Sequence, residues 1–338
     1  MNQLSDRLNR LSPSATLAMS QKSSELKAQG VDVINLSVGE PDFNTPDHIK
    51  AAAVKAVEEN YSRYSPVPGY PALREAISAK LKNENGLDYA PAQILCSNGA
   101  KQSVCNAIMA LVNAGDEVII PAPYWVSYPQ MVKLAEGEPV IVEAGIEQDF
   151  KITPEQLEAA ITPKTRALIL CSPSNPTGSV YSKEELAGLA RILAQHERVI
   201  VIADEIYEHI NYIGKHESIA QFAEIKDRVV IVNGVSKAYA MTGWRIGFIA
   251  APEWIVKGPE GAFYLFPKCS SYFGKKDGER VINNSTDFAM YLLEVGHVAT
   301  VGGDAFGSPE CFRMSYATSD ENIVEAMKRI KETLARLR

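Results

Sequence analysis

Short apolar, β-branched runs alternate with helical patterns along the middle of the chain. The candidate strands are residues 93–97, 117–121, 139–143, 167–171, 199–203, 229–233 and 244–250. Several are apolar at successive positions, which is typical of strands buried on both faces of a largely parallel sheet. The alternation therefore predicts an α/β domain over residues 45–257.

Helical patterns over residues 102–112, 154–161 and 183–195 separate these strands. The second has a clear start signal, with Thr153 as N-cap, Pro154 at the first helical position and Glu155 in the first turn. Residues 1–44 and 258–338 lack the regular alternation, and the chain ends in an amphipathic pattern over 321–337. We expect these two ends to form a second, smaller domain.

Charge and composition exclude several classes of function. The 338 residues include 34 Lys+Arg and 41 Asp+Glu, a net charge of −7, and no basic block stands out. Nucleic acid and anionic membranes are therefore not expected as partners. The start of the chain has no apolar signal core, and no run reaches the ~18 apolar residues of a membrane span. The five scattered cysteines are typical of free thiols in a reducing cytoplasm, where we expect this protein: Cys96, Cys105, Cys171, Cys269 and Cys311.

One lysine follows a predicted buried strand in the segment NGVSKAYAMTGWRIGFIAAP, residues 233–252. Lys237 lies in a turn of small residues, where burial and nearby cations would lower the pKa of its amine and favour imine formation with an aldehyde. Ser236 and Arg245 offer a hydroxyl and a guanidinium, both suited to a phosphate. Taken alone, Lys237 is equally well explained as a surface lysine near an arginine.

A carboxylate ends another predicted strand, in VIVIADEIY. Asp204 lies where open α/β sheets place their ligands, and it could keep a pyridine nitrogen protonated. Tyr207 could donate to a ring oxygen. A helix cap is the simpler interpretation of Asp204 alone.

Three further turns follow predicted strands. In SPSNPTG, the Asn175 amide could reach a ring hydroxyl, although the turn itself needs only its prolines and glycine. In SNGAKQ, Gly99, Ala100 and Lys101 place backbone N–H groups at a helix N-terminus, which favours an anion. In PAPYWVSY, Trp125 could stack on a flat cofactor or simply pack in the core. Together the five turns supply everything that a pyridoxal 5′-phosphate (PLP) site needs.

The order of these motifs resembles a known family. GEPDF, SNGAKQ, PYW, SNPTG, DEIY, SKAYAMTGWRIG and RMSYATS are similar to those of the class I aminotransferases, and most closely to the bacterial aspartate aminotransferases. The resemblance covers essentially the whole chain. It implies a three-layer α/β fold of PLP fold type I, with a mixed, mostly parallel seven-stranded sheet and a smaller α+β domain.

The resemblance also implies roles for the cofactor site. Lys237 matches the Schiff-base lysine and proton shuttle, and Asp204 the partner of the pyridinium nitrogen. Asn175 and Tyr207 match residues that hold the ring oxygen, and Trp125 matches one that stacks on the ring. The residues that match the phosphate site are Ser236, Arg245, Ala100 and the backbone of Gly99 and Lys101. Tyr64, in YSRYSPVPGY, matches a tyrosine that reaches the phosphate from the neighbouring subunit, which implies a homodimer. No metal is implied.

Substrate recognition follows from the same resemblance. Gly39 and Arg313 match the groups that bind the substrate α-carboxylate, in a site that Trp125 and Asn175 also line. Lys101 is placed to meet a distal carboxylate, which favours aspartate and glutamate as substrates. Ser12 stands where relatives that accept prephenate tend to carry a lysine, which disfavours prephenate.

These matches predict transamination from aspartate to 2-oxoglutarate through PLP. Other PLP chemistry remains an alternative, either transamination of prephenate or aromatic substrates or β-elimination. A PLP-binding protein with impaired catalysis is another, because Lys237 and Arg313 are only 76 positions apart, several dozen fewer than in the family. The segment absent between Lys257 and Gly258 corresponds to a substrate-side loop and the long interdomain helix. Either the protein lacks this segment or the printed sequence omits it.

Overall fold

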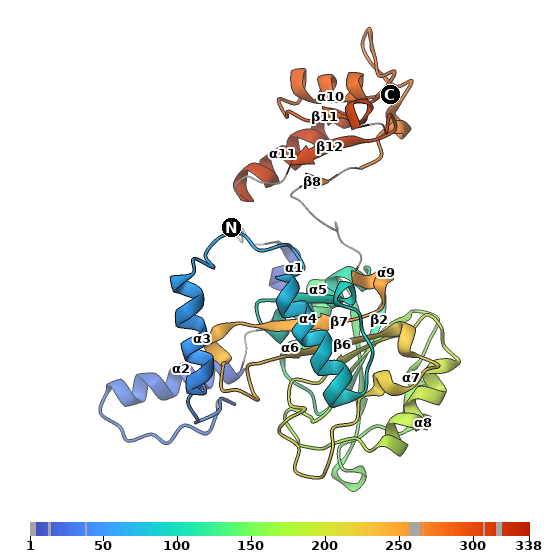
Figure 1. The fold of residues 1–338 in the computed structure, drawn as a ribbon. Coiled ribbons are helices and arrows are strands. Elements are labelled where there is room, and N and C mark those ends of the chain that lie inside the picture. The colour runs from blue at the N-terminus through green and yellow to red at the C-terminus, as the bar shows by residue number, and fades with distance from the viewer. Residues whose placement is uncertain are drawn as a thin grey trace. The chain divides into compact units, whose positions relative to one another are not determined.

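The computed structural model describes residues 5–12, 15–37, 39–256, 264–265, 267–306, 308–315 and 320–338. It divides into two compact units, Met1–Lys257 and Gly258–Arg338, coloured blue to orange and orange to red in Figure 1. The junction where the shortened interval was expected lies outside the described residues. The assignment of residues 1–44 to the smaller domain stays a prediction.

The first unit is built on a seven-stranded sheet, as predicted. Its strands lie in the order β1-β7-β6-β5-β4-β2-β3, and every neighbouring pair is parallel except the two that involve β7. The strands are β1 (Ile94–Ser97), β2 (Glu117–Ala122), β3 (Glu138–Glu143), β4 (Thr165–Cys171), β5 (Ile200–Asp204), β6 (Val229–Gly234) and β7 (Gly247–Ala250). The mixed, mostly parallel sheet is therefore confirmed.

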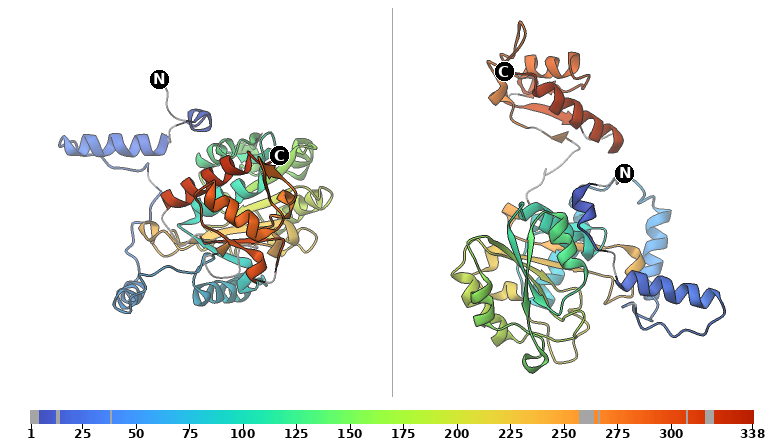
Figure 2. Two further views of the ribbon diagram at one scale, coloured as in Figure 1. Left: turned by 90° about the horizontal axis from the view of Figure 1, so that it is seen from above. Right: turned by 180° about the vertical axis from the view of Figure 1, so that it is seen from behind.

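Nine α-helices are described in this unit. They are α1 (Asp6–Asn9), α2 (Ala15–Ala28), α3 (Asp47–Glu58), α4 (Pro71–Lys80), α5 (Ala100–Leu111), α6 (Ser127–Leu134), α7 (Pro154–Ala160), α8 (Lys183–Ala194) and α9 (Glu253–Val256). The predicted start of α7 is confirmed, because the Thr153 hydroxyl accepts a hydrogen bond from the Gln156 N–H at 3.3 Å. Helices α7 and α8 lie side by side in Figure 1 and in the view from behind in Figure 2.

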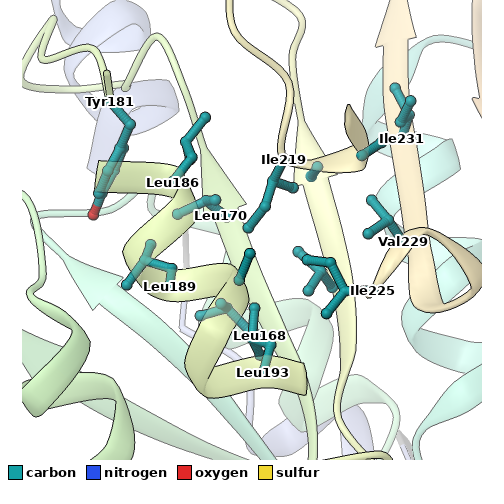
Figure 3. Close-up of a cluster of buried hydrophobic side chains, with 14 of the residues drawn as sticks. Leu168, Leu170, Tyr181, Leu186, Leu189, Leu193, Ile219, Ile225, Val229 and Ile231 are labelled. Atoms are coloured by element: carbon teal, nitrogen blue, oxygen red, sulfur yellow. The ribbon is translucent and has the colours of Figure 1, made fainter. Parts of the chain in front are cut away.

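Two apolar layers enclose the sheet, one on each face. One layer contains side chains of α4 and α8, and the other contains side chains of α5 and α6. Successive residues of the central strands alternate between them: Ile200 and Ile202 of β5 lie in the second layer, Val201 and Ala203 in the first. Figure 3 shows the first layer, where leucines of α8 meet Leu168 and Leu170 of β4. This alternation decides which way each residue at a strand end points.

One predicted strand begins later than expected. Residues Thr242–Trp244 form a 3₁₀ turn, and Arg245 adopts a left-handed conformation with φ 57°. Strand β7 therefore begins at Gly247 and not at residue 244, because a strand needs extended backbone. The turn places Arg245 at the end of the sheet where the predicted site lies.

The second unit is small and mixes helices with short strands, as predicted. Strands β11 (Val301–Gly302), β12 (Phe312–Ser315) and β8 (Tyr264–Leu265) form one sheet, and β9 (Lys276–Asp277) and β10 (Arg280–Val281) form a hairpin. Helices α10 (Ser285–Glu294) and α11 (Asp320–Leu334) accompany them. All five cysteines are free. Over the described ranges of both units, no helix is long and apolar enough to cross a membrane.

Candidate active site

A cavity of about 620 Å³ lies in the first unit, at the carboxyl ends of its parallel strands. Turns after β1, β2, β4, β5 and β6 line it, because parallel strands that run the same way end at the same edge of the sheet. The predicted residues among its walls are Gly39, Ala100, Lys101, Trp125, Asn175, Asp204, Tyr207, Ser236, Lys237 and Arg245. Gly99 directly precedes Ala100. The five turns named from the sequence thus meet in one place.

Lys237 projects into this cavity from the turn after β6. Its Nζ donates a hydrogen bond to the Gly39 carbonyl at 2.6 Å and lies 5.8 Å from the centre of the Tyr207 ring. Burial lowers the pKa of Lys237 and the nearby Arg245 charge lowers it further, while Glu40 opposes this. A neutral amine is the nucleophilic form, so this environment favours attack on a carbonyl carbon.

The Gly39 segment is held over the Lys237 turn by two further contacts. The Thr45 hydroxyl donates to the Ala240 carbonyl at 2.7 Å, and the Thr242 hydroxyl donates to the Glu40 carboxylate. Gly39 therefore closes one side of the cavity next to the lysine.

Asp204 ends β5 and is only 4% exposed. Its carboxylate accepts hydrogen bonds from the Tyr128 hydroxyl at 2.7 Å and from the Ile206 N–H at 3.3 Å. Burial raises the pKa of Asp204 to about 6, although both hydrogen bonds oppose that shift. Residues 206–209 form turns rather than an α-helix, so Asp204 is not a helix cap. A buried carboxylate facing a cavity is suited to a cationic ring nitrogen.

The N-terminus of α5 offers an anion site. Gly99 has φ 88°, and a side chain there would collide with the Arg245 guanidinium, so only glycine fits. Arg245 donates to the Thr242 carbonyl at 2.7 Å and to the Asn98 carbonyl at 3.1 Å, which fixes the guanidinium beside the helix start. First-turn N–H groups have no partner inside a helix, and the helix dipole attracts negative charge there. With the buried Ser236 hydroxyl, these donors form a set that fits a phosphate group.

Four side chains line the space between the lysine, the carboxylate and the anion site. Burial raises the pKa of Tyr207 to about 12, and a hydrogen bond with the Asn175 side chain opposes the shift. The Tyr207 hydroxyl is therefore a proton donor at neutral pH. The Lys101 ammonium lies 4.9 Å from the centre of the Trp125 ring, a cation–π distance. The donor set thus fits PLP: an amine, a carboxylate, an anion site, a phenol and an indole.

Besides Gly99, two predicted residues are not among those lining the cavity. Tyr64 is fully exposed at 102% in the single chain. Arg313 lies in β12 of the second unit, opposite Val301 of β11. Their predicted roles need a neighbouring subunit and the second unit, respectively, and stay predictions.

Sequence reasoning did not single out Tyr128, which donates to Asp204. It follows Trp125 by three positions, and its ring packs edge-on against the Trp125 ring with centroids 5.3 Å apart. Trp125 lies before α6, in a turn where the Tyr128 N–H donates to the Trp125 carbonyl at 3.0 Å, and the residue types in PYWVSY do not predict this contact. Ser37, Tyr124 and Thr242 also line the cavity, again with no signal in the sequence.

Comparison with known proteins gives one consistent result. The family model described as aminotransferase class I and II matches residues 31–258 and 250–330. A probable aspartate/prephenate aminotransferase of Rickettsia bellii is 46% identical, over 100% of both chains. The bifunctional aspartate aminotransferase and glutamate/aspartate-prephenate aminotransferase of Petunia hybrida is 44% identical, over 99% of this chain and 83% of that protein.

Solved structures agree with these sequence relatives. The aspartate aminotransferase of Rhizobium meliloti superposes with a TM-score of 0.73 at 38% identity, covering 100% of both chains. That of Thermus thermophilus, with maleate, gives a TM-score of 0.73 at 36% identity, covering 98% of this chain and 100% of the other.

The comparisons also bear on the shortened interval. The alignment with the Rickettsia bellii protein runs over 399 positions, whereas this chain has 338 residues, so 61 positions have no residue of this chain. The family match is split into two parts that overlap at residues 250–258. Relatives therefore carry several dozen residues that this sequence lacks, as expected from the spacing between Lys237 and Arg313.

Proposed function

This chain belongs to the class I and II aminotransferase family, and from that premise we propose that it binds PLP through Lys237 and moves the amino group of aspartate to 2-oxoglutarate. The observation that carries the proposal is that the Lys237 amine and the Asp204 carboxylate face one cavity from neighbouring strands, β6 and β5. Each has its pKa shifted toward the neutral form, as is common for groups that act chemically.

The cavity wall assigns a holder to each part of the cofactor. Ser236, Arg245 and the first turn of α5 would hold the phosphate, and Asp204 would hold the ring nitrogen. Tyr207 and Asn175 would hold the ring oxygen, while Trp125 would cover one ring face. Bound PLP supplies an aldehyde that condenses with amines and a ring that delocalises the electrons released at the substrate Cα.

Lys237 would then move the proton. The lowered pKa of Lys237 favours the neutral amine, the form that could accept the substrate Cα proton and hold it for return. Bound PLP would supply the chemistry that releases the 2-oxo acid. The same residues working in reverse would aminate 2-oxoglutarate.

Lys101 supports a dicarboxylic substrate. Its ammonium lies at the cavity wall over Trp125, where it would meet the distal carboxylate of aspartate or glutamate. Gly39 and Arg313 would bind the α-carboxylate, with Arg313 forming a bidentate pair. Changing Lys101 to Gln should therefore raise KM for aspartate more than KM for an uncharged amino acid such as alanine.

The proposal is tested with purified full chain of verified intact mass, supplied with PLP, aspartate and 2-oxoglutarate. We expect oxaloacetate and glutamate in equal amounts, with no turnover in Lys237→Ala. In a separate assay with serine, which carries a leaving group on Cβ, pyruvate and ammonia formed without a 2-oxo acid would instead indicate β-elimination. PLP binding without either reaction would favour a binding protein whose catalysis is impaired by the missing segment.

Prephenate is a second candidate acceptor, because relatives named aspartate/prephenate aminotransferases are up to 46% identical over the whole chain. Ser12, which argues against it, lies beside α6, where its backbone N–H donates to the Gln130 side chain at 3.0 Å. We therefore expect weak activity with prephenate and glutamate, and higher activity after Ser12→Lys. Equal prephenate activity in wild type and Ser12→Lys would show that Ser12 does not disfavour prephenate.

A homodimer with shared sites is also proposed. The single chain exposes an apolar series in the N-terminal part of its first unit: Ile34, Leu36, Phe43, Val54, Val57, Tyr61, Tyr64 and Val67. Exposed apolar side chains gathered in one part of the sequence are typical of a segment that a partner covers. Sedimentation equilibrium should give twice the chain mass, and Tyr64→Ala should weaken PLP binding; a monomer that binds PLP fully would contradict the shared site.

A further inference from the structure

The carboxylate that follows Asp204 points to the other face of the sheet. Strand β5 alternates between the two apolar layers, so Asp204 faces the layer of Tyr128 and the cavity, whereas Glu205 faces the opposite layer. The Glu205 N–H continues the pairing with β6 by donating to the Val232 carbonyl at 2.9 Å. Glu205 is 3% exposed, so this second carboxylate is buried directly behind the candidate partner of the ring nitrogen.

Two side chains from the loop after residue 210 meet Glu205. The Ser218 hydroxyl donates to one carboxylate oxygen at 2.5 Å. The His216 Nε2 lies 3.1 Å from the other oxygen, and the His216 side chain is only 6% exposed. Both side chains are therefore largely shielded from bulk water, at a distance that fits an ion pair although the two atoms are not aligned as a hydrogen bond.

The charged groups around His216 and Glu205 indicate the protonation state of the pair. Glu208, also buried, forms an ion pair with Lys80 and accepts from the Asn85 side chain at 2.8 Å. The Lys80 ammonium is therefore already paired with Glu208. A buried carboxylate without a counter-charge costs several kcal/mol of folding free energy. The remaining titratable neighbours described around the pair are His209, Glu84 and Tyr89, of which His209 contacts Glu208 and Glu84 rather than Glu205. His216 is left to balance Glu205.

We propose that His216 carries a proton and forms a buried ion pair with Glu205, and that this pair neutralises the charge behind Asp204 so that Asp204 stays anionic for the ring nitrogen. His216 and Glu205 are thus positioning residues for the reaction, acting through Asp204. The second half of the proposal rests on the proposed function; the ion pair itself does not.

The electrostatics agree with this arrangement. Burial lowers the pKa of His216, but the hydrogen bond and charge of Glu205, joined by Glu208, outweigh it and raise the pKa overall, with Lys80 opposing. The Glu205 charge raises the pKa of Asp204, as a nearby like charge does. The other groups facing Asp204 are Tyr128, Cys171 and Tyr207. An unbalanced Glu205 would therefore favour neutral Asp204.

The first experiment measures the wild-type chain and uses variants only to assign its signals. NMR titration of the full wild-type chain, with His→Gln variants used to assign the five histidines, should show His216 still protonated above pH 6.5. A neutral His216 at pH 6 would overturn the proposal. This measurement is made without cofactor, so it stands even if the chain proves not to bind PLP.

The second experiment follows Asp204 by ¹³C NMR, assigned with Asp204→Asn. His216→Gln should raise the Asp204 pKa by about one unit, since it leaves Glu205 unbalanced. Glu205→Gln, which keeps an acceptor for Ser218, should lower it. The double variant should return it close to the wild-type value, as expected for directly coupled sites.

With ¹⁵N-labelled PLP added, the ring nitrogen of His216→Gln should lose its proton at lower pH than in wild type. If His216 had only a structural role, His216→Gln should lower the melting temperature but leave the titrations of Asp204 and of the ring nitrogen unchanged. That result would overturn the coupling to Asp204. If Asp204 shifts as expected but the ring nitrogen does not follow, the ion pair stands and the proposed role of Asp204 fails.

Discussion

At the end of β5, the adjacent carboxylates of Asp204 and Glu205 lie on opposite faces of the sheet and have different partners. On the cavity side, Asp204 accepts hydrogen bonds but forms no ion pair within the described part of the chain, and burial raises its pKa to about 6. On the far side, Glu205 has a hydroxyl and a histidine within contact distance. Both are almost fully buried, so burial alone does not separate them.

The difference separates buried groups that stabilise the fold from buried groups that are available for chemistry. A group that awaits a ligand is left short of a partner, and it costs stability until the ligand arrives. A buried carboxylate with a hydroxyl donor and a cation in contact, as we propose for Glu205, stabilises the fold. Substitutions on the cavity side should therefore damage chemistry and spare stability, whereas those on the far side should do the reverse.

The largest effect is expected at Lys237. Lys237→Ala removes the amine that we propose bonds the cofactor and moves the proton, so kcat should fall about 10⁴-fold or more. The free energy of unfolding should change by less than about 1 kcal/mol, because the side chain is half-buried beside a cavity. Urea unfolding and the aspartate assay measure the two effects; a large loss of stability would break the comparison.

Asp204→Asn should separate activity from stability. The kcat should fall about 10³-fold, because the ring nitrogen loses its anionic partner. The folded-state pKa of Asp204 is raised from 3.8 to about 6, so its stabilising contribution is present below pH 3.8 and is lost as pH rises through 6.

Without cofactor, Asp204→Asn should accordingly be more stable than wild type by about 2–3 kcal/mol above pH 6, with the gap closing below pH 4. Urea unfolding of both proteins from pH 4 to 8 measures this gap. A difference in unfolding free energy that does not change with pH would mean that the pKa of Asp204 is not raised.

On the far side, Glu205→Ala should cost about 3 kcal/mol of stability, because His216 loses its counter-charge and must give up its proton, and Ser218 loses its acceptor. Activity per folded molecule should fall less than it does in Asp204→Asn. Glu205→Gln is the matched control, since it keeps an acceptor for Ser218. Wild-type stability in Glu205→Ala would show that the pair is not charged.

The smallest effect is expected at Tyr128, on the cavity side. Tyr128→Phe removes the hydrogen bond to Asp204 and should raise its pKa, which lowers kcat about tenfold, as for one hydrogen bond to a charged group. The phenylalanine ring keeps the contact with Trp125, so stability should stay within about 1 kcal/mol of wild type. An unchanged pH profile of kcat would remove Tyr128 from the site.

Strand positions and the cavity side were predictable from the sequence because both follow short-range rules. Apolar runs gave six of the seven strands to within two residues at each end, and parallel strand ends gather on one edge. The start of β7 was missed because Arg245 adopts a left-handed conformation, which residue type does not predict for arginine.

The far side was not predictable for a different reason. Glu205 and His216 are joined by a loop whose path depends on tertiary packing, and no motif spacing marks their contact. Tyr64 and Arg313 rest on family resemblance alone, since their roles need another subunit or the second unit.

The central claim is that Lys237 is the residue that bonds PLP, and reductive trapping tests it most directly. The full chain is incubated with PLP, reduced with borohydride, digested and analysed by mass spectrometry. The account predicts one pyridoxyl-phosphate group, on the peptide that contains Lys237, and none on that peptide in Lys237→Ala. A label on another lysine, or no label at saturating PLP, would contradict it.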